Sequence, residues 1–99
     1  MGLYLAILKS ELMRKIKLNS LERRELIIAM RKIIGQMQAI VSQMDEDKVT
    51  EQTFTQLLAV KGGASRICKE IISKGILNNL EDYTREDLDN ALNIIFKLD

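Results

Sequence analysis

The stretch from Thr50 to Leu80 constrains the fold most, because it is the longest run of this chain that can form one helix. Its apolar residues recur at alternating steps of three and four, the spacing of a helix packed on other helices. The first apolar row consists of Leu57, Val60, Ala64, Ile67 and Ile71. A second row beside it consists of Phe54, Leu58, Cys68 and Ile72. The pattern predicts a central helix covered on more than one side. Gly62 and Gly63 suggest a close approach of another backbone, with tolerated sequence drift as the alternative.

A second long helix is predicted from about Ser20 to Met44, after a capping-box pattern formed by Asn19 and Glu22. Its apolar seam, at four-three steps, consists of Leu26, Met30, Ile33, Met37, Ile40 and Met44. A further stripe at seven-residue intervals consists of Ile27, Ile34 and Val41. Two stripes on one helix exceed what a lone three-helix protomer can cover. The sequence therefore predicts two long antiparallel helices that dimerise into a four-helix bundle, with further stacking into a tetramer.

The remaining segments predict shorter elements. Asp45 to Val49 forms an acidic turn that lacks the ligand spacing and the glycine of a calcium loop. A short helix should run from Thr84 to about Leu98, since Thr84 and Asp87 form a cap pattern. Residues 1–18 form an N-terminal extension in which Leu5, Leu8, Leu12 and Ile16 recur at helical spacing. This extension predicts an extra amphipathic helix packed on the oligomer, with a membrane-surface role or a DNA-contacting arm as alternatives.

Composition supports a single all-α domain over residues 1–99. Of these residues 46% are hydrophobic but only 4% are aromatic, and there is no proline or tryptophan. One cysteine and no histidine exclude a disulfide framework within the chain and the usual zinc sites. The apolar run from Leu3 to Leu8 is too short to span a membrane. We therefore expect a cytoplasmic protein.

Charge is distributed unevenly along the chain. Residues 1–41 carry a net charge of +5 and residues 42–99 carry −4. A basic half and an acidic half are typical of a nucleic-acid face with a solvated back, although ordinary surface charge gives the same pattern. The sequence does not indicate a catalytic function, because the chain has no histidine, no phosphate-binding glycine loop and no carboxylate pair on an apolar face. The chain is therefore not expected to be an enzyme.

Several short motifs resemble the CsoR/RcnR/FrmR family of small, all-helical bacterial repressors over roughly residues 21–98. The matching features are Arg31-Lys32-Ile33 running into Gly35-Gln36, the acidic turn at Asp45 to Asp47, Gln56, and Ala59-Val60-Lys61. Members of that family respond to copper, nickel or cobalt, formaldehyde, or persulfide. The resemblance implies a tetramer that binds operator DNA through a basic face rather than through a helix-turn-helix.

The same resemblance places the effector ligands of the metal-responsive members at Thr50, Gly75 and Asn79. None of these is a soft ligand, whereas copper(I) needs sulfur and nickel or cobalt need imidazole. Formaldehyde sensing needs a cysteine at the Thr50 position, and persulfide sensing needs two cysteines. The lone Cys68 falls at a hydrophobic position and is interpreted as a buried, unreactive residue. No cofactor and no metal are therefore expected.

The resemblance assigns DNA contacts to Arg31, Lys32 and Lys61, and Arg23 and Arg24 could extend the patch. Two arginines that the family often carries in this helix are replaced by Ala29 and Ile34, which weakens the assignment. The sequence predicts a DNA-binding transcriptional repressor that forms a homodimer or homotetramer and has lost the known effector ligands. The alternative is a protein-interaction module, or a subunit of a mixed oligomer, that kept the helical bundle without binding DNA.

Overall fold

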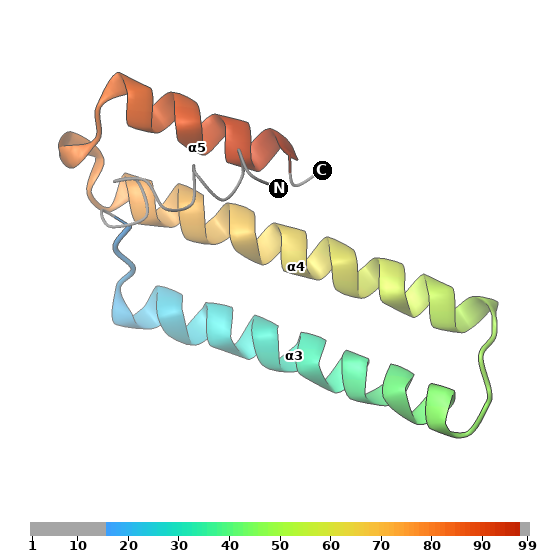
Figure 1. Cartoon of the computed structure of the whole chain (residues 1–99). Coiled ribbons are helices and arrows are strands. Elements are labelled where there is room, and N and C mark those ends of the chain that lie inside the picture. Colours follow the sequence, from blue (N-terminus) through green and yellow to red (C-terminus); the bar gives the residue numbers. More distant parts are fainter. Residues whose placement is uncertain (1–15, 98–99) are drawn as a thin grey trace.

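The computed structural model describes residues 16–97, which form an all-α protomer with no strand among them. Its elements are α3 (Ser20–Asp45), α4 (Glu51–Leu77), the 3-10 helix η1 (Leu80–Asp82) and α5 (Arg85–Lys97). Helices α3 and α4 form an antiparallel hairpin, and α5 folds back along the end of α4 that is distant from the hairpin turn (Figure 1). The predicted three-helix protomer is confirmed. Of the N-terminal extension predicted as a helix over residues 1–18, residues 1–15 lie outside the described part, and residues 16–18 are not helical.

Reciprocal caps start two of the helices where the sequence predicted them. At α3 the Asn19 N–H donates to Glu22 Oε1 at 3.0 Å, and the Glu22 N–H donates to Asn19 Oδ1 at 2.8 Å. At α5 the Thr84 N–H donates to Asp87 Oδ2 and the Asp87 N–H donates to Thr84 Oγ1, both at 3.1 Å. Each cap satisfies backbone donors that a helix start leaves without a partner.

The turn between the long helices forms at the predicted acidic segment. Helix α3 ends at Asp45, and Asp47 adopts a left-handed backbone with φ of 55°, a conformation that aspartate tolerates better than most residues. The Lys48 N–H closes the turn by donating to the Gln43 carbonyl at 2.8 Å. Helix α4 ends at Leu77, three residues before the predicted end at Leu80. Asn78 and Asn79 follow it, and asparagine favours caps and turns over helix interiors.

A polar cluster joins α3 to α4 next to the turn. The buried Thr53 is 2% exposed, and its hydroxyl donates to Gln43 Oε1. The Thr53 hydroxyl oxygen also accepts a hydrogen bond from the Thr50 N–H at 3.0 Å. The amide of Gln43 donates onward to Gln56 Oε1 at 2.7 Å. These bonds fix the relative position of the two helices, because each buried polar atom would be left without a partner if they slid.

The middle of the hairpin is close-packed at one of the two adjacent glycines. A Cβ added to Gly63 would lie 3.2 Å from Ile33 Cδ1, whereas one added to Gly62 would meet nothing within 4 Å. The predicted close approach is therefore made by a side chain, not by a backbone, and it concerns Gly63 alone. Gly62 costs helix stability without a packing reason in the protomer.

The buried apolar cluster lies between α5 and the adjoining end of α4. It consists of Ile72, Ile76, Ala91 and Ile94, with Tyr83, Leu88 and Ile95 packed around it. Along the hairpin itself the buried apolar residues are Leu26, Ile40 and Ile67. The cluster holds α5 against α4.

Large apolar side chains stay exposed along the hairpin. The seven-residue stripe of α3 is 45% exposed at Ile27, 54% at Ile34 and 53% at Val41. On α4 Phe54 is 62% and Leu58 is 67% exposed. The protomer therefore leaves the second stripe of each long helix largely uncovered, which a folded monomer rarely does over so long a surface.

Candidate nucleic-acid interface

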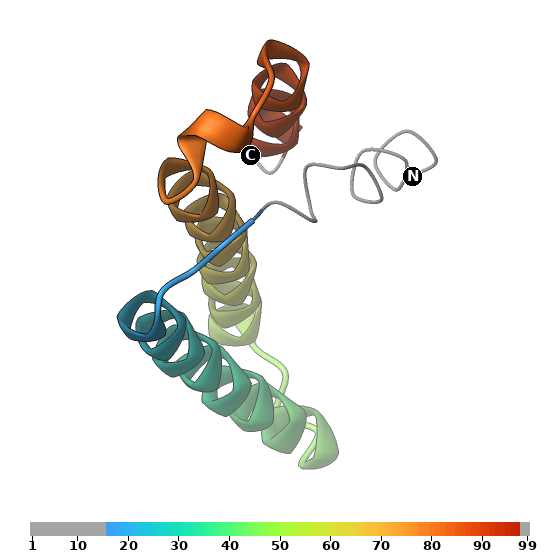
Figure 2. The ribbon, with the colours of Figure 1, turned by 90° about the vertical axis from the view of Figure 1, so that its left-hand side faces the viewer.

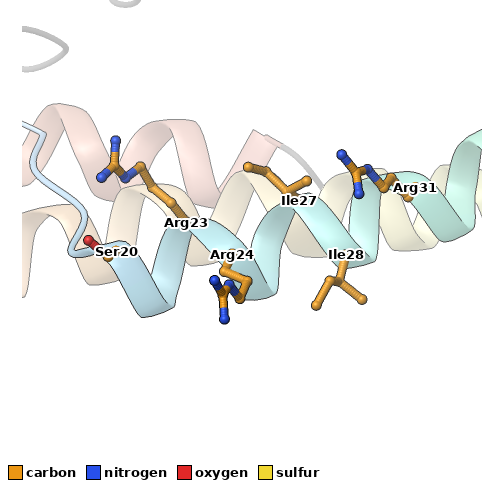
Figure 3. Close-up of a pocket in the computed structure, with 6 residues that line it drawn as sticks. All are labelled: Ser20, Arg23, Arg24, Ile27, Ile28 and Arg31. Atoms are coloured by element: carbon orange, nitrogen blue, oxygen red, sulfur yellow. The ribbon is translucent and has the colours of Figure 1, made fainter.

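Three arginines of α3 share one shallow pocket on the outer surface of the hairpin. The pocket has a volume of about 360 Å³ and is lined by Ser20, Arg23, Arg24, Ile27, Ile28 and Arg31. Figure 3 shows the guanidinium groups of Arg23 and Arg31 on one side of the helix and that of Arg24 on the other, all projecting outward. We call this surface the arginine pocket.

Helical spacing brings these residues together. Side chains three or four positions apart lie on the same helix face, so Arg23, Ile27 and Arg31 align. Arg24 and Ile28 form the parallel row beside them. All three arginines are exposed, and within residues 16–97 none forms an ion pair. Arginine presents a planar fork of donors that matches phosphate oxygens, so unpaired guanidinium groups at this spacing form a surface suited to an anionic polymer.

Lys32 lines a different pocket from its neighbour Arg31, although Ile28 lines both pockets. Successive residues of a helix are rotated by about 100°, and Lys32 accordingly lines a groove between α3 and α4 that has a volume of about 530 Å³. Arg66 of α4 lines the same groove, together with Glu25 and Glu70. The adjacent pair predicted as one patch thus lines two neighbouring pockets, and Lys32 continues the row of Arg24 and Ile28.

The sequence did not identify Arg66, because the predicted patch was limited to the positions that match the family motifs and to Arg23 and Arg24 near them. The signal that could have found it is periodicity, since Gly63, Arg66, Ile67 and Glu70 follow one face of α4. Lys61 is exposed on α4 but lines neither the arginine pocket nor this groove. The structure therefore brings Arg23, Arg24 and Arg31 together in one pocket, and it places Lys32 in the adjoining groove. Lys61 lies apart from both.

The three positions matched to effector ligands are not brought together within one protomer. Thr50 is the N-cap of α4, whereas Gly75 lies in its last turn and Asn79 precedes η1. A helix of 27 residues is about 40 Å long, so Thr50 is separated from the other two by nearly the length of α4. Gly75 is buried, and Ile16 Cβ would lie 3.2 Å from a Cβ added there.

The interpretation of Cys68 as a buried residue is wrong for the protomer, in which it is exposed. Cys68 follows the buried Ile67 directly, and the rotation between successive helical residues turns its side chain away from α3. Within residues 16–97 no group of three or more histidine, cysteine, aspartate or glutamate side chains is arranged to hold a metal ion. Nor is any helix in that range long and apolar enough to cross a bilayer.

The fold and the cationic pocket together define a small all-α protein whose outer helix carries a surface suited to phosphate contacts. A comparison with protein-family models matches residues 22–97 to the metal-sensitive transcriptional repressor family. The match covers most of the chain, and the chain belongs to that family. It is thus a regulator of the transcriptional repressor type, as the sequence motifs indicated. Comparisons with curated proteins and with solved structures each gave no match.

Proposed function

We propose that this protein is a DNA-binding transcriptional repressor that assembles into a homodimer or homotetramer and no longer responds to the metals, formaldehyde or persulfide sensed within its family. The observation that carries the proposal is the arginine pocket, because three exposed arginines, none in an ion pair within residues 16–97, line one pocket of α3 in a chain of a repressor family. Phosphate contacts of this kind position a protein on DNA.

Assembly is supported by the exposed apolar stripes. Ile34 and Val41 are more than half exposed on α3, and Phe54 and Leu58 are exposed on α4. A second hairpin packed against these surfaces would complete a four-helix bundle. In such an assembly the arginine pocket is repeated in every copy, so a modest surface per chain becomes an extended cationic one.

The residues present do not fit a metal of the kind that the family name implies. Thr50 and Asn79 offer only neutral oxygen and amide groups, and a side chain on residue 75 would collide with Ile16. A cross-subunit arrangement of these positions would still lack sulfur and imidazole ligands. Repression that persists without a metal, or that answers to another signal, follows from this chemistry.

The alternative function is a protein-interaction module, or a subunit of a mixed oligomer, that does not bind DNA. Its specific support is the replacement of two family arginines by Ala29 and Ile34, the second of which is 54% exposed. An apolar side chain at an exposed position favours a protein partner over a phosphate. Direct DNA binding separates the two functions.

The test is a binding titration on DNA from the region upstream of the protein's own gene, at several salt concentrations. Each phosphate contact adds about 0.9 to the slope of log affinity against log salt. Replacing Arg23 and Arg31 with alanine should weaken binding to all sequences and flatten this slope. The matched control is Lys48→Ala, which removes one exposed cation from the hairpin turn, where Lys48 pairs with Glu46 at 3.4 Å.

Further variants distinguish the two surfaces. Lys32→Ala and Arg66→Ala test the interhelical groove, and Lys61→Ala tests the remaining predicted contact. Weaker binding by the Arg23 and Arg31 variant alone would assign the interface to the arginine pocket. Absence of binding by the unaltered protein at low salt, or identical salt slopes for all variants, would contradict the proposed function and favour the interaction module.

A further inference from the structure

The described start of the chain lies across the last turn of α4. The Lys17 N–H donates to the Gly75 carbonyl at 3.5 Å, and the Asn78 side-chain amide donates to the Lys17 carbonyl at 3.0 Å. The same amide nitrogen donates to Glu22 Oε1 at 2.6 Å. Figure 2 shows this segment crossing from the first turn of α3 to α4. We call residues 16–19 the strap.

Gly75 is shaped to receive the strap. A Cβ at this position would collide with Ile16 Cγ2 and would lie 3.2 Å from Ile16 Cβ and 3.4 Å from Ile16 Cα. No glycine of the described chain has a positive φ, so backbone conformation does not require glycine here. Glycine inside a helix costs about 1 kcal/mol relative to alanine. The close passage of Ile16 explains why this residue carries no side chain.

The strap is connected to the arginine pocket through the first turn of α3. Glu22 accepts hydrogen bonds from Asn19, within the α3 cap, and from Asn78, beyond the end of α4. Arg23 and Arg24 follow Glu22 directly. The Asn78 amide therefore ties the end of α4 both to the strap and to the turn that carries two of the three arginines.

We propose that the last turn of α4, around Gly75 and Asn78, is a docking site for this chain's own N-terminal segment, and that docking fixes Arg23 and Arg24 for DNA binding. The occupant is the strap, because Ile16 and Lys17 lie on the site. The link from docking to DNA binding rests on the proposed function. The docking site itself does not depend on that function.

The first experiment measures docking by limited trypsin digestion of the full-length protein. Trypsin cleaves after Lys17, whose carbonyl is held by Asn78 in the docked strap. Gly75→Ala should accelerate this cleavage by at least about tenfold, since cleavage of an opening segment follows the population of its open form. Ile16→Gly makes room for the new methyl group. The double variant Ile16→Gly with Gly75→Ala should therefore be cleaved after Lys17 at about the rate of Ile16→Gly alone.

Three controls keep the result specific. Gly62→Ala makes the same substitution in α4 where nothing lies within 4 Å, and it should leave cleavage after Lys17 unchanged. Cleavage after Lys61, in the middle of α4, reports unfolding of the helix itself and should stay slow in every variant. Cleavage rates that do not depend on protein concentration identify the docked segment as the chain's own and not that of a second copy.

The second experiment applies the DNA titration to the same variants. Gly75→Ala should lower DNA affinity, and Ile16→Gly combined with it should restore part of the loss. An unchanged cleavage rate in Gly75→Ala, or equal acceleration with and without Ile16→Gly, would overturn the docking site. Faster cleavage with unchanged DNA affinity would overturn the link to Arg23 and Arg24. If the unaltered protein does not bind DNA, the proposed function fails, while the cleavage result still decides whether the strap docks.

Discussion

Glu22 is the residue at which the most local interactions converge. The hydrogen bond from the Asn19 backbone is the main reason that the pKa of Glu22 lies below its ordinary value of 4.5. The Asn78 side-chain amide lowers this pKa further, and the positive charge of Lys74 adds to the effect. Each of these contacts favours the ionised carboxylate. Ionised Glu22 therefore holds together the α3 cap, the strap and the end of α4.

The pH dependence follows from the direction of that shift. A carboxyl whose pKa is lower in the folded state stabilises the fold above its unfolded pKa, and this contribution is lost as pH falls through the folded pKa. The unaltered protein should therefore be more stable than Glu22→Gln at pH 7, and the difference should shrink below about pH 4. Denaturant titrations at both pH values measure this. A difference in stability that is the same at both pH values would contradict the role of Glu22.

Thr53 is the second residue that connects two elements. Its hydroxyl donates a hydrogen bond to Gln43 Oε1 and accepts one from the Thr50 N–H, and the residue is only 2% exposed. Thr53→Val keeps the shape but leaves both partners unsatisfied, so we expect a loss of about 1–3 kcal/mol in the free energy of unfolding. Chemical denaturation provides the measurement. Thr55→Val is the matched control, because the exposed Thr55 hydroxyl bonds only the Glu51 carbonyl; a loss as large there would refute the argument.

At the scale of elements, the helices could be predicted because periodicity and caps are local. The Asn19–Glu22 and Thr84–Asp87 pairs define helix starts within four residues of sequence, and both form as expected. The surfaces could be predicted less well, because they depend on where each residue lies around the helix. Arg31 and Lys32 are adjacent in sequence yet line different pockets.

Contacts between segments that are far apart in the chain could not be predicted from the sequence pattern. Nothing in the neighbourhood of Gly75 indicates that Ile16 packs on it, since the two residues are 59 positions apart and belong to different elements. The exposure of Cys68 also depends on which face of α4 meets α3. The family motifs supplied candidate cations but not their grouping, which left Arg66 unnoticed.

The paired glycines of α4 give a prediction at this scale. Gly62→Ala should stabilise the protein by about 1 kcal/mol, because alanine has the higher helix propensity and its methyl group meets nothing. Gly63→Ala should stabilise the protein less, because its methyl group would lie 3.2 Å from Ile33 Cδ1 and the Ile33 side chain would have to shift. Thermal unfolding of both variants tests the difference. A larger gain at Gly63 would show that the hairpin is less closely packed there than the structure indicates.

For the whole molecule, the exposed stripe of α3 determines the expected assembly. Ile34 is 54% exposed in the protomer, so Ile34→Glu should leave the helices intact but place an unpaired carboxylate in a subunit interface, at a cost of several kcal/mol. Sedimentation should then show smaller particles with an unchanged helical circular dichroism spectrum. Val49→Glu, which adds the same charge in the turn, should leave the assembly intact. A monomeric unaltered protein at micromolar concentration would contradict the prediction.

The uneven placement of buried side chains has a consequence for how the molecule opens. The apolar cluster of Ile72, Ile76, Ala91 and Ile94 lies at one end, while the opposite end relies on the hydrogen bonds of Thr53, Gln43 and Gln56. Regions with few buried apolar contacts open locally at low free energy, whereas clustered cores open only with the whole domain. We therefore expect fraying to begin at the hairpin turn. The backbone amides there should exchange with solvent long before those of the helix turns that carry the apolar cluster.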